Sequence, residues 1–271
     1  HIECSVMSRK YLGETIDIHA GGEDLIFPHH ENEIAQSECA NGKTFVHYWM
    51  HNAFLNIDNH KMSKSLGNFK TVRDIDEQYD PQVLRYLMLS AHYRSPLNFS
   101  AELMESAKAS YERIVTCMEN LNFRLAGAQK AEAGTAKAVS EEETKVLQEA
   151  EKCRGEFEAA MDDDFNTADA LAGVFNLVKV INTGSNEQSS AAFLESLKKE
   201  LNELCGVLGL IAERTQETSG EEAAWVEKMI QERQDARKAR DFARADAIRD
   251  ELKEKGIVLE DTRDGVKWKK A

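Results

Sequence analysis

The sequence predicts an α/β segment, followed by an all-α helical bundle and a small α+β module. All three prolines and all eight histidines of the 271 residues precede residue 97. The Pro-free remainder is rich in Ala, Glu, Lys and Leu, which favour helices. Residues 221–271 add two short strand-like runs around Gly265 to helical stretches. We place the parts at residues 1–70, 71–100, 101–214 and 221–271.

Composition limits the classes of protein that fit. The net charge of −14 argues against a generally basic nucleic-acid coat, although a local basic patch can still bind RNA. No apolar run approaches the roughly 18 residues that a membrane span needs, so we expect no membrane partner. Five scattered cysteines fit a reducing cytoplasm. The chain starts at His1 without a methionine, which we interpret as the start of a fragment.

The α/β segment has a strand signal followed by a loop signal. Residues 15–18 include three β-branched side chains and predict a short strand. The strand is expected to end in a loop at His19 to Gly22, where two glycines let the backbone approach a ligand. An ordinary turn is the alternative. Further on, Asp80 and Pro81 predict a helix start, with Val83, Leu84, Leu87 and Met88 on its apolar face.

Three amphipathic stretches after residue 100 predict long antiparallel helices, because their apolar residues recur mostly at intervals of three and four. The stripes are Met104, Ala107, Tyr111, Ile114, Val115, Met118 and Leu121; Leu171, Val174, Phe175, Val178 and Ile181; and Phe193, Leu194, Leu197, Leu201, Leu204 and Leu208. We expect these stripes, together with Phe165, to form the core of a bundle. We interpret the stretch from Gly127 to Ser140 as a mobile linker between helices.

The last module carries a cluster of cations. Residues 221–271 hold 13 acidic and 13 basic side chains, so the negative excess lies upstream. We predict helices near 223–240 and 242–255, the second ending at Gly256. Phosphate contact plus aromatic stacking would suit an RNA loop, and ion pairs on a solvated helix are the alternative. The candidate RNA-binding residues are Arg233, Arg237, Lys238, Arg240, Arg244 and Trp268.

The strongest chemical signal is the pentad Lys-Met-Ser-Lys-Ser at 61–65, followed by Leu-Gly-Asn. Lysines three residues apart, interleaved with hydroxyl groups, make a cationic loop that suits a triphosphate. A lone pair of lysines at this spacing is usually a solvated basic loop, but the full string is far rarer. We therefore predict a phosphate-binding loop made of Lys61, Met62, Ser63, Lys64 and Ser65.

The pentad is identical to the KMSKS signature of class I aminoacyl-tRNA synthetases, and the chain most resembles the cysteinyl-tRNA synthetase family. The resemblance runs through residues 1–5, 17–24, 27–33, 161–167, 243–250 and 256–268. It implies that the α/β segment is a remnant of a Rossmann-like catalytic domain that lacks the half carrying the HIGH signature. It implies an anticodon-binding type of bundle and a tRNA-binding C-terminal module. It also implies that His19, Gly21, Gly22 and Asp24 lie against the adenylate, with Lys61 and Lys64 catalytic. Ala20 and Glu23 depart from the family pattern in that loop.

His29 and Glu33 are four residues apart, so on a helix they share one face and could hold a zinc ion. A solvated helix start with an ion-paired Glu is the alternative. The resemblance favours zinc, one per chain, and implies Cys4 as a third ligand and a cysteine outside this chain as the fourth. Zinc would separate cysteine from serine, which an apolar pocket does poorly.

The resemblance implies ATP-dependent ligation of L-cysteine to its tRNA through cysteinyl adenylate, with Mg2+ accompanying ATP. We expect this fragment alone to be inactive. One alternative is a related ligase that joins cysteine to an amino sugar, and the basic C-terminal module argues against it. The other is a non-catalytic tRNA-binding module.

Overall fold

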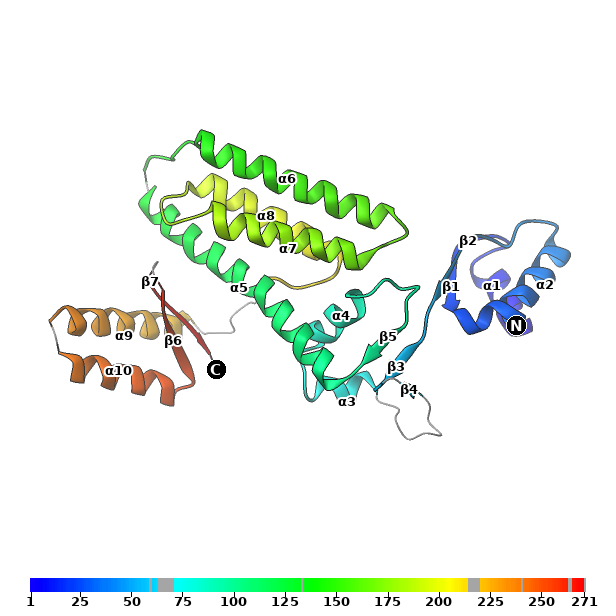
Figure 1. Ribbon diagram of the computed structural model, residues 1–271, viewed down its shortest axis with the longest axis horizontal. Helices are drawn as coiled ribbons and strands as arrows, with labels where there is room; N and C mark the ends of the chain where they lie inside the picture. The colour runs from blue at the N-terminus through cyan, green and yellow to red at the C-terminus, as the bar shows by residue number, and fades with distance from the viewer. Residues whose placement is uncertain are drawn as a thin grey trace. The chain divides into compact units, whose positions relative to one another are not determined.

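The computed structural model of the chain describes residues 1–58, 60–62, 71–132, 134–213, 220–239, 241–262 and 265–270. The chain divides into two compact units, of which the second consists of Arg214–Ala271 with Asn186–Gln188 (Figure 1). The elements of the first unit are α1 (Ile2–Tyr11), β1 (Ile16–Gly22), η1 (Glu23–Leu25), η2 (Ile26–His30), α2 (Glu31–Asn41), β2 (Val46–Asn52), β3 (Leu55–Ile57), β4 (His60–Lys61), α3 (Val72–Asp76), α4 (Pro81–Leu89), β5 (Leu97–Phe99), α5 (Ala101–Ala131), α6 (Glu141–Asp162), α7 (Thr167–Gly184) and α8 (Ala191–Val207). Those of the second are α9 (Gly220–Lys238), α10 (Phe242–Glu254), β6 (Ile257–Thr262) and β7 (Gly265–Lys270).

The α/β segment is built on two parallel strands, β1 and β2, with α1 and α2 packed against each other beside them (Figure 1). The predicted strand exists, but it does not end at residue 18. It continues to Gly22 because His19 pairs with Trp49 and Gly21 pairs with His51 in the ladder. The expected loop at His19 to Gly22 is therefore wrong: this stretch is strand.

A second small sheet, in the order β4-β3-β5, precedes the bundle. The helix predicted at Asp80 is α4, and Asp80 accepts a hydrogen bond from the backbone N–H of Gln82. Val83 and Leu87 are buried as expected. Met88 is 48% exposed, so its assignment to the apolar face is wrong; Tyr86 is buried instead.

Helices α5 to α8 form the bundle, and the predicted stripes supply its core. Almost all their members are buried, including Tyr111, Leu121 and Leu201. The linker expected from Gly127 begins too early. Helix α5 continues to Ala131, because Leu125 and Ala128 are buried on the same helical face as the stripe.

Phe165 is not part of the core. Its side chain is 51% exposed, in contrast to the prediction. The reason is the turn between α6 and α7, where Asp164 and Phe165 have φ values of 56° and 54°. Two consecutive left-handed residues reverse the chain sharply, and the phenyl ring consequently leaves the helical stripe.

The second unit is a helix pair with a two-stranded antiparallel sheet, as the sequence predicts. Val226, Ile248, Leu252 and Ile257 form its small core. Gly256 has a φ of 72°, which allows the chain to leave α10 and enter β6.

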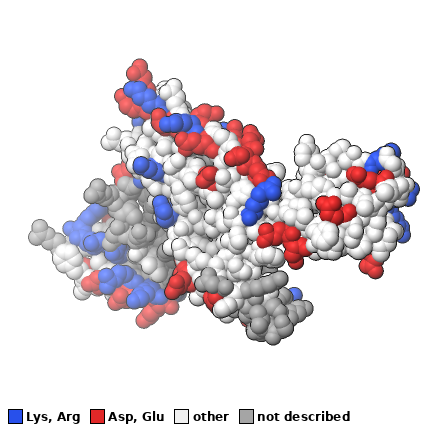
Figure 2. Space-filling view, turned by 45° about the vertical axis from the view of Figure 1, so that its right-hand side comes forward, with Lys and Arg blue, Asp and Glu red and all other residues white. Residues whose placement is uncertain are grey.

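Acidic side chains are unevenly distributed over the first unit. On the face drawn in Figure 2, Asp and Glu side chains gather along the bundle, where α6 lies. Helix α6 starts with three consecutive glutamates, Glu141 to Glu143. A polyanion would be repelled from this side of the bundle. No helix among the described residues is long and apolar enough to cross a bilayer.

Candidate metal centre and signature segment

Cys4, His29 and Glu33 meet in the structure, as predicted. Cys4 lies on α1, His29 on the turn η2 and Glu33 in the first turn of α2. A potential ligand atom of each lies within 4.8 Å of those of the others. Residues from two helices and a turn therefore present a sulfur, a nitrogen and an oxygen to one point.

Glu33 is the buried centre of this group. The residue is 0% exposed, which is costly for a carboxylate unless it is paired or binds a metal. Its Oε1 atom lies 2.7 Å from Nε2 of His29, yet the geometry is not that of a hydrogen bond, and Oε1 has no hydrogen-bond partner. The two atoms lie at ion-pair distance, and together with Sγ of Cys4 they also form a set that could hold one cation. The donor set of thiolate, imidazole and carboxylate fits zinc.

His19 holds the other oxygen of this carboxylate. Its Nε2 lies 2.8 Å from Oε2 of Glu33, and its ring stacks on Trp49 with centroids 4.5 Å apart. The resemblance implies a contact of His19 with the adenylate, whereas here its Nε2 orients Glu33. Such an outer hydrogen bond fixes a ligand and raises its basicity.

His30 and His51 complete a cluster of rings around Trp49, and the sequence prediction missed all three. His30 is 3% exposed, and its Nδ1 lies 2.9 Å from Nε2 of His51. Burial lowers the pKa of His30, and the neighbouring His19 lowers it further. Alternation along β2 was the available signal, because Trp49 and His51 are two residues apart and therefore face the same side of the strand.

A second possible metal-binding group is formed by His19, His30 and Glu33, whose ligand atoms also lie within 4.8 Å of one another. Here Nε2 of His19 and Oε2 of Glu33 already pair with each other. In the set containing Cys4, by contrast, Oε1 of Glu33 accepts no hydrogen bond, so Cys4, His29 and Glu33 are the better candidate set.

The structure shows a packing reason for glycine at position 21 that the sequence did not predict. A Cβ atom at this position would lie 2.8 Å from Cε1 and 3.0 Å from Nε2 of His30. The group that approaches the backbone here is therefore the ring of His30. At Gly22 the nearest atom would be Oδ1 of Asp24, at the end of an exposed side chain that can move.

Replacement of Gly21 by alanine is expected to destabilise the α/β segment by about 1–3 kcal/mol, because the buried His30 ring must shift. Chemical denaturation monitored by Trp fluorescence checks this. Gly22→Ala is the matched control and should have a smaller effect. Equal effects of the two substitutions would contradict this explanation.

The signature pentad is described only in part. Strand β4 ends at Lys61, and Met62 is half-buried against the apolar core of the first unit. Ser63, Lys64 and Ser65 lie outside the described residues. The pentad thus begins within a short strand, β4, that pairs with β3.

The predicted RNA-binding cations differ in accessibility. Arg233 is 6% exposed, which disagrees with a surface contact, because it lies on the same stripe of α9 as Val226 and Met229. Trp268 is half-buried and packs against the core of the second unit. Arg237, Lys238 and Arg244 are exposed. Lys238 lies near Asp235, and Arg244 lies near Glu232. Arg240 lies outside the described residues.

Comparisons with known proteins find similarity along most of the chain. Residues 1–109 match the family model "tRNA synthetases class I (C) catalytic domain", residues 156–213 match "DALR domain", and residues 220–268 match "Cysteinyl-tRNA ligase anticodon binding domain". The chain is 56% identical over 271 residues to a cysteine–tRNA ligase of Lachnospira eligens, covering 100% of this chain and 56% of that protein. It is 52% identical over 270 residues to one of Clostridioides difficile, with the same coverage.

Solved structures resemble the fold. The LeuRS of a ternary LeuRS–tRNA–LeuAMS complex from Agrobacterium radiobacter K84 aligns with a TM-score of 0.55 at 18% identity, over 76% of this chain and 29% of that one. A putative arginyl-tRNA synthetase from Campylobacter jejuni aligns with a TM-score of 0.53 at 15% identity, over 79% and 50%.

The parallel strand pair, the signature pentad that begins in β4 and the helical bundle define a remnant of a class I aminoacyl-tRNA synthetase with its helical domains. The chain spans about 56% of the length of the curated relatives that it matches. Within that class it belongs to the cysteinyl-tRNA synthetase family.

Proposed function

We propose that the intact protein ligates L-cysteine to its tRNA in two steps that use ATP. Cysteine attacks the α-phosphorus of ATP to give cysteinyl adenylate and pyrophosphate, and the 3′ end of the tRNA then takes the acyl group. The observation that carries this proposal is the convergence of Cys4, His29 and Glu33 on one point, with Oε1 of Glu33 buried and without a hydrogen bond.

Zinc, one per chain, is the metal we propose for this centre, held by Cys4, His29 and Glu33. When bound, zinc supplies an affinity for thiolate over hydroxyl and a lowered thiol pKa, which distinguishes cysteine from serine. The residues of the chain do the rest. His19 holds Oε2 of Glu33, and the rings of His19, His30 and His51 pack around Trp49 beside it.

The lysines of the pentad act on the nucleotide. We propose that Lys61 and Lys64 stabilise the negative charge that develops on pyrophosphate as it leaves, with Met62, Ser63 and Ser65 completing the loop and Mg2+ accompanying ATP. His19, Gly21, Gly22 and Asp24 stay candidates for the adenylate site. Such chemistry needs little from the protein besides position and charge.

For tRNA, we propose contact through the C-terminal unit and through faces of the bundle away from α6. Arg237, Lys238 and Arg244 expose cations on α9 and α10, whereas the glutamates of α6 would repel phosphates. The match of residues 220–268 to an anticodon-binding domain supports a tRNA partner and disfavours ligation to an amino sugar. We place this activity in the cytoplasm.

Exchange of labelled pyrophosphate into ATP by the intact protein tests the proposal. Cysteine should support exchange, serine should not, and Lys64→Ala should reduce the rate about a hundredfold. Lys43→Ala, at an exposed lysine paired with Glu14, is the control and should leave the rate unchanged. Binding of tRNA without any cysteine-dependent exchange would favour the non-catalytic tRNA-binding module.

A further inference from the structure

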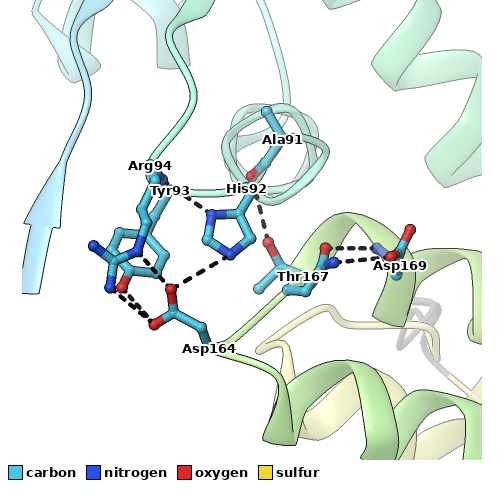
Figure 3. Close-up of polar contacts among 8 residues, drawn as sticks. Ala91, His92, Tyr93, Arg94, Asp164, Thr167 and Asp169 are labelled. Atoms are coloured by element: carbon cyan, nitrogen blue, oxygen red, sulfur yellow. Dashed lines mark hydrogen bonds and ion pairs between the residues drawn. The ribbon is translucent and has the colours of Figure 1, made fainter.

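Asp164 collects polar contacts from three consecutive residues that lie between α4 and β5. Tyr93 donates its hydroxyl to Oδ1 of Asp164 at 2.7 Å, and Arg94 donates from Nε to Oδ2 at 2.5 Å and from Nη2 to Oδ1 at 3.3 Å. Nε2 of His92 lies 3.9 Å from Oδ2. Figure 3 shows the three side chains converging on the one carboxylate. Asp164 belongs to the bundle, whereas its partners belong to the segment before it.

The backbone at Asp164 is adapted to this contact. Asp164 and Phe165 both have left-handed φ values, 56° and 54°, which cost on the order of 1 kcal/mol each in non-glycine residues. Thr167 adds a long hydrogen bond of 3.5 Å from its hydroxyl to the carbonyl of Ala91. Strained backbone of this kind is typical of positions where function requires a fixed side-chain position, and here it directs the carboxylate of Asp164 toward Arg94 and Tyr93.

Tyr93 connects this contact to the strand that leads into the signature pentad. Its backbone carbonyl accepts a hydrogen bond of 2.9 Å from the N–H of Ala53, two residues before β3. Strand β3 is then held on one side by β5 and on the other by β4, where Asn56 pairs with Lys61. Hydrogen bonds at Asp164, Tyr93 and β3, joined by short stretches of the covalent chain, therefore connect Asp164 with the first residue of the pentad.

We propose that Asp164 is a positioning residue for nucleotide activation, which through Tyr93 and Arg94 fixes β3 and β4 and so the point from which the pentad departs. The inference rests on the proposed function, since it needs the pentad to act on ATP. A small displacement of a catalytic group from its productive position lowers the reaction rate, even though no chemical group has been removed.

Stability and rate are expected to respond differently. The side chains of Arg94 and Asp164 are 52% and 42% exposed, and exposed ion pairs contribute little to stability. Hydrogen bonds from Arg94 and Tyr93 hold the pKa of Asp164 at about 2, so the carboxylate is charged at neutral pH. A purely structural role would therefore produce a small change in unfolding and no specific change in the activation step.

The test is pyrophosphate exchange by the intact protein carrying Asp164→Asn, Arg94→Ala or both. Asparagine tolerates the left-handed backbone, so the turn is kept while the charge is lost. We expect about a fivefold lower kcat for each single variant, with KM for cysteine unchanged. The double variant should lose no more than either single one, because the two residues act through one contact. Asp163→Asn, at the exposed neighbour in the same turn, is the matched control.

Three results would overturn the inference: a change no larger than that of Asp163→Asn, additive losses in the double variant, or a loss of rate that follows a loss of folded protein in thermal melting. If Asp164→Asn does not fold, Arg94→Lys provides the same comparison, because it keeps the charge but loses the two-nitrogen contact. Wild-type protein without cysteine-dependent exchange would instead refute the proposed function.

Discussion

Cys4→Ser is expected to lower the zinc content of the intact protein at least about tenfold, because a neutral hydroxyl is a poor zinc ligand beside the imidazole of His29 and the carboxylate of Glu33. The three donors lie within 4.8 Å of one another, so the loss of one leaves an incomplete set. Elemental analysis of purified protein measures the change. Glu33→Gln should have a comparable effect, since the buried Oε1 of Glu33 accepts no hydrogen bond and lies 2.7 Å from Nε2 of His29.

Cys39→Ser is the matched control for this experiment. Cys39 lies on α2, six residues after Glu33, and its side chain is exposed. Its replacement should leave the zinc content at the wild-type level. Normal zinc in Cys4→Ser would remove Cys4 from the centre. Loss of zinc in the control as well would indicate that the segment, rather than the ligand set, had been disturbed.

Periodicity was sufficient to predict the helical part of the fold. The stripe of α5 from Met104 to Leu121 is buried throughout, because one helical face is covered by its neighbours over its whole length. Periodicity failed where backbone geometry decided the outcome. Phe165 continues an apolar pattern in sequence, yet the left-handed turn at residues 164 and 165 exposes it. No propensity scale assigns a left-handed backbone to a phenylalanine.

The sequence spacing of His29 and Glu33 indicated that these two residues lie together. The contacts that depend on the pairing of strands β1 and β2 were not predicted. His29 and Glu33 are neighbours on consecutive turns, so local spacing reveals them. His51 meets His30 only because β2 lies beside β1 in a register that puts His51 opposite Gly21. Arg233 shows the converse error, since a cation in a basic cluster was expected on the surface and its place on the α9 stripe buries it. Strand register and helix orientation depend on tertiary structure, so the number of charged residues in a segment does not predict them.

The bundle contains a buried carboxylate that joins the starts of two helices. Glu143 lies in the first turn of α6, is 7% exposed, and forms a capping box with Ser140. Its Oε1 also accepts from the backbone N–H of Ser190 at 2.6 Å, and its Oε2 accepts from the Ser190 hydroxyl at 3.0 Å. Ser190 is the N-cap residue of α8. One side chain therefore satisfies donors at the N-termini of both α6 and α8, where negative charge is also favourable.

Glu143→Ala should destabilise the bundle by about 3 kcal/mol, because it leaves the buried donors of Ser190 without an acceptor. Urea unfolding monitored by circular dichroism measures the change, and Glu142→Ala, at the exposed neighbour in the same turn, should change stability by less than about 0.5 kcal/mol.

Burial alone would raise the pKa of Glu143, but hydrogen bonds from Ser140 and Ser190 bring it below its ordinary value of 4.5. A lowered pKa in the folded state means that this stabilisation is complete above pH 4.5 and is lost as the pH falls through the folded-state pKa. The stability difference between wild type and Glu143→Ala should therefore shrink in acid, and a difference that stayed constant from neutral pH down to acid unfolding would show that the carboxylate charge does not contribute.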